Sequence, residues 1–309
     1  MFRTEANLIK YVICGGTGFI GSELTKYWLQ AGNEVAIVGR NLPKAAPYHP
    51  KLSYHTWDSL IADHAPLENA DALVNLAGAS LSQRWSPSGK KAIMHSRLAT
   101  VSAAAKLLDS LKHKPSVVIQ ASAVAIYGTS LQDTFSESSP AHVMDFPSEV
   151  VHTWEEASDK AYQDIRLIKL RTGVVLGNES GAFPKMKLPY LLGFGGNIGK
   201  GSQWVPWIHL TDIVRLIDYC IQNPAISGPV NATAPHPVTN EEFGRTIGKV
   251  YKRPHWFPLP AFLLKTAVGE LSEILLKGQR VLPAAALEQG FSFTFPTLQA
   301  ALEDLKSQK

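Results

Sequence analysis

The sequence predicts an α/β protein: a Rossmann-type, doubly wound parallel sheet with a smaller C-terminal α+β lobe. Three observations lead to this prediction. Short, nearly continuous apolar runs alternate with amphipathic stretches through the first half of the chain, which is typical of a parallel sheet covered on both faces. A glycine-rich turn follows the first apolar run, and beyond Gly177 glycine, proline and aromatic residues become dense.

The N-terminal part contains the elements of such a sheet in order. The first helix is indicated by Leu24, Tyr27, Trp28 and Ala31, which share one helical face. We expect helices at 22–31 and 90–112, and strands at 9–14, 34–38, 52–57, 71–76, 115–121 and 165–170.

The C-terminal part predicts fewer regular elements. We expect a helix at 211–223, an amphipathic stretch at 261–276 that ends before Gly278, and a strand at 291–295, where three phenylalanines alternate. These elements divide the chain into two domains. Residues 1–177 and 205–230 would form the cofactor-binding domain, and residues 178–204 and 231–309 the smaller lobe.

Composition excludes several classes of protein. The 309 residues are 45% hydrophobic and 18% charged, with a formal net charge of +4, so the chain can bury a core and has no basic stripe for nucleic acid. Cys14 and Cys220 are too few for a disulfide scaffold or a zinc ribbon, and no Cys/His cluster has metal-ligand spacing. No apolar run approaches the roughly 20 residues of a membrane span, and the N-terminus lacks the pattern of a signal peptide. We therefore expect a cytoplasmic protein with a small-molecule substrate and with no metal, nucleic-acid or membrane partner.

The glycine-rich turn is the strongest functional signal. It reads GGTGFIG, follows a predicted strand and opens a predicted helix. Gly15 would allow the tight turn, Gly18 a close approach of the backbone to a pyrophosphate, and Gly21 the packing of helix on strand. The helix N-terminus attracts an anion. The motif therefore predicts a dinucleotide site, in which we also include Thr17, Phe19 and Ile20.

The residue after the second strand indicates which dinucleotide the site would bind. NAD-binding folds usually place Asp or Glu about 20 residues beyond the glycines, but this chain has Gly39-Arg40 there. A guanidinium suits the 2′-phosphate of NADP(H), and Lys44 could add charge. The alternative is that Arg40 is a solvated loop residue. The end of the third strand is less informative, because Asp58 could lie near an adenine edge or cap a helix.

Several motifs resemble a known family. GGTGFIG, NLAG and ASAVAIYG resemble the extended short-chain dehydrogenase/reductase superfamily. QWVPWIH, PVNATAPHPVTNEEF and GQRVLPAAALEQGFSF resemble its atypical "epimerase family protein" group, which is NAD-dependent epimerase/dehydratase-like and has its own C-terminal domain. The resemblance implies NADP(H) as cofactor, with Arg40, Leu76, Ala77 and Arg97 at positions that touch it. We group Gly78 and Val174 with these cofactor-binding candidates.

The catalytic residues of that superfamily are missing. Its chemistry uses a Tyr-x-x-x-Lys pair on a helix, yet no tyrosine here has lysine four residues later. Ser122, Tyr127 and Glu155 are the substitutes we select, with His152 as a further alternative to Glu155. Ala123 is nearer than Ser122 to the register of the usual hydroxyl. Each candidate also has a structural interpretation: Tyr127 as core, Glu155 as a solvated or ion-paired residue.

The segment 193–209 is the expected substrate side. Lys200, Gln203, Trp204 and Trp207 offer a cation, an amide and flat apolar faces, which suit a small polar or cyclic ligand. The alternative is a glycine-rich hairpin whose tryptophans fill the seam between lobes. Asp212, in a His-x-x-Asp sequence, is predicted to be a first-turn helix charge rather than a reagent.

Two functions follow from these residues. The first is an NADP(H)-dependent oxidoreductase or epimerase-like enzyme acting on an unidentified small molecule. The second is a non-catalytic NADP(H)-binding sensor or scaffold, suggested by the missing Tyr/Lys pair. The stretch 261–276 would either pack into the smaller lobe or form the face of a homodimer.

Overall fold

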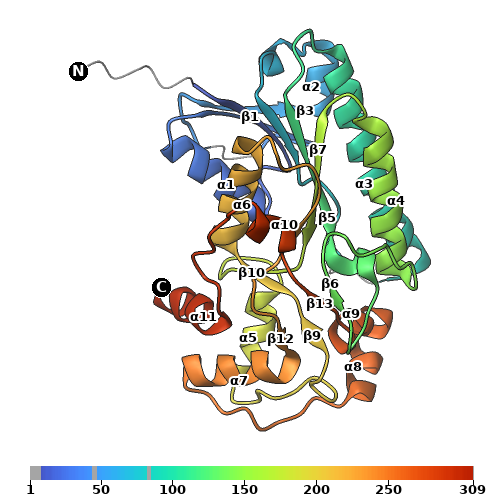
Figure 1. Cartoon of the computed structure of the whole chain (residues 1–309), viewed down its shortest axis with the longest axis vertical. Coiled ribbons are helices and arrows are strands. Elements are labelled where there is room, and N and C mark those ends of the chain that lie inside the picture. Colours follow the sequence, from blue (N-terminus) through green and yellow to red (C-terminus); the bar gives the residue numbers. More distant parts are fainter. Residues whose placement is uncertain (1–7, 44–46, 82–84, 309) are drawn as a thin grey trace.

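The structure is a computed structural model, and it describes residues 8–43, 47–81 and 85–308. Its centre is a seven-stranded sheet in the order β11-β7-β5-β4-β1-β2-β3, with every neighbouring pair parallel (Figure 1). The strands are β1 (Lys10–Cys14), β2 (Glu34–Gly39), β3 (Leu52–Thr56), β4 (Ala72–Asn75), β5 (Val117–Ala123), β7 (Arg166–Thr172) and β11 (Gly228–Ala232). The predicted doubly wound parallel sheet is confirmed.

Helices cover both faces of this sheet. On one face lie α1 (Phe19–Gln30) and α6 (Leu210–Gln222), and on the other α3 (Pro87–Ser110) and α4 (Phe146–Ala161) (Figure 1). Two separate hydrophobic clusters fill the spaces between helices and sheet. The short α2 (Trp57–Ala62) follows β3, and its N-cap is Thr56 rather than Asp58, because the Thr56 side chain accepts a hydrogen bond from the Ser59 amide at 3.1 Å.

A smaller lobe lies beyond the carboxyl ends of the strands (Figure 1). A third hydrophobic cluster forms its core, between α5 (Phe183–Leu191), α7 (Asn240–Tyr251) and α11 (Leu298–Ser307). Three short strand pairs connect segments distant in sequence: β8 (Val174–Leu176) with β10 (Trp207–His209), β9 (Trp204–Val205) with β12 (Val238–Thr239), and β6 (Thr134–Phe135) with β13 (Arg280–Val281). The lobe is completed by α8 (Ala261–Val268) and α9 (Ser272–Leu276), whereas α10 (Ala284–Glu288) returns to the central sheet and packs against β11.

Two C-terminal predictions are wrong. Residues 291–295 form no strand, because Asp212 takes the backbone groups that would pair: its carboxylate accepts the Thr294 and Phe295 amides at 2.7 and 2.8 Å. Phe291 is nevertheless buried, as the alternation suggested. The stretch 261–276 is two helices rather than one, separated by a turn at Gly269, which has a φ of +61°.

Candidate functional site

The glycine-rich turn joins β1 to α1 at the carboxyl edge of the sheet. Gly15 has a φ of +83°, and a Cβ there would lie 3.0 Å from the Ala77 amide nitrogen, so only glycine fits. Gly21 is equally constrained, because its Cβ would lie 2.5 Å from the Gly15 carbonyl oxygen. These contacts hold the turn against β4 and bring α1 close to the sheet, as the motif predicts.

The turn leaves the start of α1 open to a ligand. Gly18 is the N-cap residue, and it has no side chain to bond the first amides of the helix. Thr17 and Gly18 are exposed. The helix therefore presents amide groups and the positive end of its dipole at the surface, where a phosphate can bind. The Phe19 ring packs toward Gly177 and Gly181 and Ile20 packs against the core, so these two residues could meet a ligand only through their backbone.

Arg40 lies one residue beyond β2, the strand next to β1. Its side chain is exposed and makes no hydrogen bond or ion pair with any described residue. Gly39 ends β2 and is partly buried. Arg40 is therefore a free cation on the strand adjoining the glycine turn; Lys44 lies outside the described residues.

Leu76, Ala77 and Gly78 continue from β4 and form the second wall of this region. The Leu76 amide bonds the Cys14 carbonyl at 2.9 Å, which keeps the segment beside β1. Gly78 is exposed, and a Cβ on it would contact the Arg97 side chain at 3.6 Å. Leu76 and Ala77 thus lie directly beside the glycine turn, and Gly78 leads from them to Arg97.

Arg97 is the unusual group of this wall. Its side chain is buried and, among the described residues, bonds only the Ala79 and Ile93 carbonyls, at 3.3 and 3.1 Å; its guanidinium lies 5.0 Å from the Trp154 ring. No carboxylate of a described residue pairs with it, and burial lowers the pKa of the guanidinium to about 10. It remains charged at neutral pH, so this region holds a buried cation without a counter-ion.

Ser122, Glu155 and Tyr127 also come together, but in a buried network between β5, β7 and α4. The Glu155 carboxylate accepts a hydrogen bond from Ser122 at 2.6 Å and two from Arg171, both at 2.9 Å. Lys169 lies 3.7 Å from the same carboxylate. Burial alone would raise the pKa of Glu155, but Arg171, Ser122 and Lys169 outweigh burial and leave this pKa below its usual value.

Tyr127 is held by the same network. Its hydroxyl accepts a hydrogen bond from Arg171 at 2.9 Å and donates one to the Asn231 side chain at 2.8 Å. The ring is fully buried and stacks on Phe135. Burial raises the pKa of this hydroxyl more than Arg171 lowers it. Both hydrogen-bonding capacities of the tyrosine are used inside the protein.

The end of β5 also carries groups outside this network. Ala123 is partly exposed there, and the carbonyl of the next residue, Val124, accepts a hydrogen bond from the Gln279 side chain at 2.9 Å. Between α3 and α4, the apolar side chains of Trp85, Ile93 and Val150 form a separate cluster. His152 lies on the exposed side of α4, 3.9 Å from Glu156. Among these residues only Gln279, which sequence reasoning missed, brings a polar side chain to the end of β5.

The four predicted substrate residues do not converge. Trp207 is buried in the core of the smaller lobe, and the buried Gln203 amide donates to the Ile198 and Leu275 carbonyls at 3.0 and 2.9 Å. Trp204 is partly exposed under the Arg280 guanidinium, and Lys200 is exposed with no partner among described residues. Trp207 thus packs inside the smaller lobe, whereas the alternative interpretation placed the tryptophans in the seam between the lobes. Val174 lies where β7 leads into the same lobe, with its amide on the Pro206 carbonyl at 2.7 Å.

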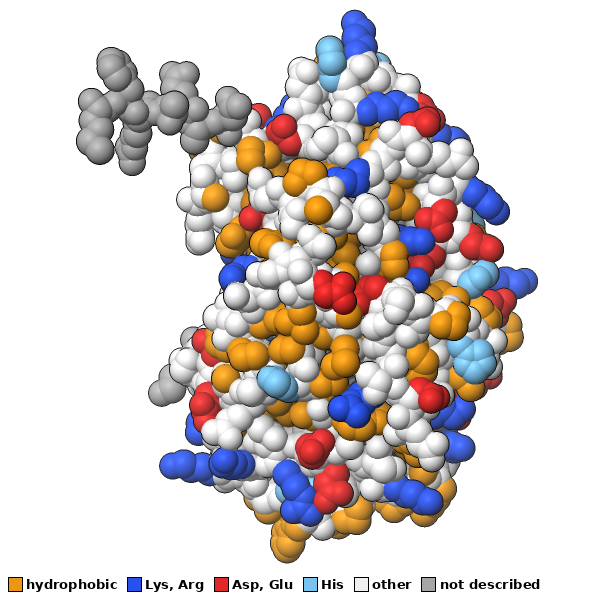
Figure 2. Space-filling model, in the orientation of Figure 1, with side chains coloured by type: hydrophobic (Ala, Val, Ile, Leu, Met, Phe, Trp, Pro, Cys, Tyr) orange, Lys and Arg blue, Asp and Glu red, His pale blue; other side chains and the backbone are white. Residues whose placement is uncertain are grey.

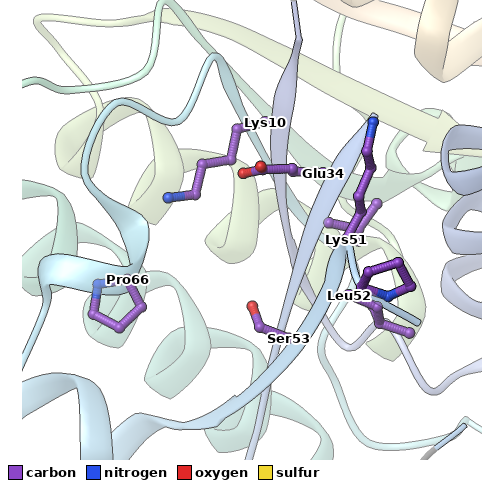
Figure 3. Close-up of a pocket in the computed structure, with 8 residues that line it drawn as sticks. Lys10, Glu34, Lys51, Leu52, Ser53 and Pro66 are labelled. Atoms are coloured by element: carbon purple, nitrogen blue, oxygen red, sulfur yellow. The ribbon is translucent and has the colours of Figure 1, made fainter. Parts of the chain in front are cut away.

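A shallow pocket lies elsewhere, at the amino ends of β1, β2 and β3. Figure 3 shows Lys10, Glu34, Lys51 and Ser53 around it. Ligands of open α/β sheets bind outside the carboxyl ends of the strands, so this pocket is not the dinucleotide site. In the described portion of the chain, no three His, Cys, Asp or Glu side chains are grouped closely enough to hold a metal ion, and no helix is long and apolar enough to cross a membrane.

Sequence reasoning overlooked the residues that hold the network together. Arg171 ends the apolar run of β7, and Asn231 lies opposite it on β11. A charged residue in a strand that is buried on both faces needs a buried partner. The sequence signal was therefore Arg171 in the apolar run IRLIKLR, which predicts a buried carboxylate partner. Glu155 is that partner in the structure.

The comparisons with known proteins agree over almost the whole length. Residues 11–232 match the NAD dependent epimerase/dehydratase family, and residues 259–305 match a domain of unknown function, DUF1731. The chain is 44% identical over 293 residues to "Epimerase family protein YfhF" of Bacillus subtilis, covering 94% of this chain and 96% of that protein.

Solved structures show the same relationship. The human epimerase family protein SDR39U1 (isoform 2), crystallised with NADPH, matches with a TM-score of 0.89 and 35% identity, over 97% of this chain and 100% of that one. A nucleoside-diphosphate sugar epimerase from Corynebacterium glutamicum matches with a TM-score of 0.78 and 29% identity, over 98% of this chain and 59% of that one. By its sequence matches, its fold and its glycine-rich turn, this chain belongs to the NAD dependent epimerase/dehydratase family.

Proposed function

We propose that the protein binds NADP(H) at the carboxyl edge of the sheet and acts as an oxidoreductase or epimerase-like enzyme on a small molecule. The observation that carries this proposal is the buried guanidinium of Arg97, which has no counter-ion among the described residues and lies beside Gly78, in the segment whose Ala77 borders the glycine turn. A buried cation without a counter-ion is costly, and an anionic ligand would supply the missing charge. The relative crystallised with NADPH supports the same cofactor.

Different residues of the site would bind different groups of the cofactor. Gly15, Gly18 and the open amides of α1 would hold the pyrophosphate, and Arg97 would add positive charge on the side of β4. Arg40 would bind the 2′-phosphate that distinguishes NADP(H) from NAD(H). When bound, the nicotinamide supplies or accepts a hydride.

Exchanging the charge at Arg40 tests this assignment. Arg40→Asp should weaken NADP⁺ binding at least tenfold while changing NAD⁺ binding much less, because only NADP⁺ carries the 2′-phosphate. Lys106→Asp, an equal change of charge at an exposed position of α3, is the matched control and should leave both affinities unchanged. If Arg40→Asp loses the same factor of affinity for NADP⁺ and for NAD⁺, the assignment is refuted.

Proton transfer must be assigned separately from cofactor binding. Glu155 is the proposed proton-transfer group, with Ser122 and Tyr127 as orienting groups, although all three have their hydrogen bonds engaged by protein. For Glu155 to act, it would have to leave Arg171 when substrate binds. If Glu155 is the proton-transfer group, Glu155→Gln should abolish oxidation of NADPH by a carbonyl compound, whereas Arg40→Ala should retain turnover at saturating cofactor.

The same geometry favours a second candidate, an NADP(H)-binding sensor or scaffold. The specific observation is that Tyr127 and Glu155 are both held in a buried hydrogen-bond and ion-pair network, so that neither side chain is free to meet a substrate. Tight NADP(H) binding with no loss of NADPH absorbance across a broad carbonyl library would support the sensor. Turnover of any library member would support the enzyme.

A further inference from the structure

The smaller lobe carries a large apolar surface that nothing in the described chain covers. Two short segments, 188–194 and 256–262, contribute hydrophobic side chains that are each more than half exposed. Trp256 and Phe262 are 74% and 67% exposed. We call this surface the apolar patch, and its principal members are Leu188, Leu192, Phe194, Trp256, Phe257 and Phe262.

The two segments lie beside each other because their backbones are joined. The Gly195 carbonyl accepts both the Trp256 and the Phe257 amides, at 2.9 and 3.0 Å, and the Trp256 indole donates to the Gly193 carbonyl at 2.9 Å. The Phe194 and Phe257 rings meet edge to face at 6.1 Å. The aromatic side chains are therefore presented by a hydrogen-bonded platform rather than by independent loops.

The two stretches of chain that carry the apolar patch contain only basic charged side chains. Residues 180–211 and 243–269, which contain both segments, have no Asp or Glu. Five exposed cations of these residues make no ion pair or side-chain hydrogen bond with any described residue: Lys185, Lys200, Lys252, Arg253 and Lys265. Just before the second segment, Glu241 is paired with Arg245, and Glu242 closes the N-terminus of α7. Figure 2 shows hydrophobic side chains along the lower edge of the molecule, with basic side chains and some acidic ones above them.

Exposed apolar side chains together with cations that lack an ion-pair partner indicate which kind of partner the patch would bind. A second copy of the chain meeting the same patch would oppose one set of cations with another, which disfavours a symmetric dimer. Exposed Trp, Phe and Leu surrounded by Lys and Arg are typical of surfaces that lie in the interface of an anionic bilayer. We propose that the apolar patch docks the protein peripherally on an anionic lipid surface, with the aromatic rings at headgroup depth and the cations on lipid phosphates. This departs from the expectation of no membrane partner, which rested on the lack of a spanning segment.

Vesicle binding by the full chain tests the proposal. The protein should sediment with vesicles of 70% phosphatidylcholine and 30% phosphatidylglycerol, bind pure phosphatidylcholine at least tenfold more weakly, and dissociate as salt is raised. Trp256 is exposed, so its fluorescence should shift to the blue on binding. Trp256→Ser/Phe262→Ser should reduce the association constant at least tenfold, and Lys252→Gln/Arg253→Gln should reduce both affinity and salt dependence.

Controls separate docking from damage to the fold. Ile61→Ser on α2 removes an equally exposed apolar side chain outside the patch, and should leave vesicle binding unchanged. Circular dichroism and NADP⁺ affinity should be unaltered in all variants. The proposal is overturned if no anionic vesicle binds at low salt, or if Trp256→Ser/Phe262→Ser binds like the wild type. It is also overturned if sedimentation reveals a dimer that this double substitution dissociates, because the patch would then join two copies.

Discussion

Removing the guanidinium of Arg171 should strongly destabilise the protein. Arg171→Leu deletes three hydrogen bonds of 2.9 Å, two to Glu155 and one to Tyr127, and leaves the Glu155 carboxylate buried. Breaking a buried ion pair from one side costs about 3–5 kcal/mol. Lys169, 3.7 Å from the carboxylate, remains and compensates in part, so we expect a loss near the lower end of that range. The total free energy of unfolding of a typical domain is only about 5–15 kcal/mol.

Equilibrium urea unfolding at pH 7 measures this loss, provided that the transition is two-state. Arg171→Leu/Glu155→Met removes both charges and should be less destabilised than the sum of the two single variants, because no charge is left buried without a partner. A loss below about 1 kcal/mol in Arg171→Leu would refute the reasoning, since a properly buried carboxylate cannot lose its partner at so little cost.

The same ion pair predicts a pH dependence with a definite sign. The pKa of Glu155 is lower in the folded protein than the ordinary carboxyl value of 4.5. Its contribution to stability is therefore complete above that value and lost as the pH falls through the lower, folded pKa. Wild-type stability should fall in this acid range more steeply than that of Arg171→Leu/Glu155→Met. If the free energy of unfolding of the wild type and that of Arg171→Leu/Glu155→Met fall equally steeply with decreasing pH, the loss cannot be assigned to Glu155.

Further predictions concern single positions. Gly15→Ala should lower the free energy of unfolding by about 1–3 kcal/mol, and by more than Gly32→Ala does. Both glycines have a φ of +83°, but only a Cβ at position 15 meets a neighbour. Equal losses of unfolding free energy in the two variants would contradict the clash. Arg97→Met should weaken NADP⁺ binding at least tenfold while changing the free energy of unfolding by no more than about 1 kcal/mol, and unchanged affinity would remove Arg97 from the site. Asp212→Ala should lose about 2–4 kcal/mol in urea unfolding, because the Thr294 and Phe295 amides lose a charged acceptor; a neutral effect would contradict this role.

The sheet was predictable from sequence because its signals are local. Apolar runs and one glycine turn set β1, α1 and β2 within a few residues of their observed bounds. The segment 291–295 was mispredicted because alternation reports which side chains are buried and not which group takes the backbone hydrogen bonds. Here that group is the carboxylate of Asp212, about 80 residues away in sequence and invisible to a local pattern.

The candidate site divides in the same way. The Gly15 turn was predictable because its conformation requires glycine. The environment of Glu155 was not, because its partner Arg171 comes from a different element and only the folded sheet brings the two together. The residues Gln203 and Trp207 have side chains that suit a ligand equally well as a core, and burial, which sequence does not give, placed them inside.

Isothermal titration of the purified protein with NADP⁺ and with NAD⁺ tests the central claim most directly. The glycine turn, Arg97 and Arg40 together predict saturable binding of one dinucleotide per chain, with a dissociation constant for NADP⁺ at least about tenfold below that for NAD⁺, a difference of about 1.4 kcal/mol. Tighter binding of NAD⁺ would contradict the role of Arg40. No heat from either dinucleotide would contradict the site itself.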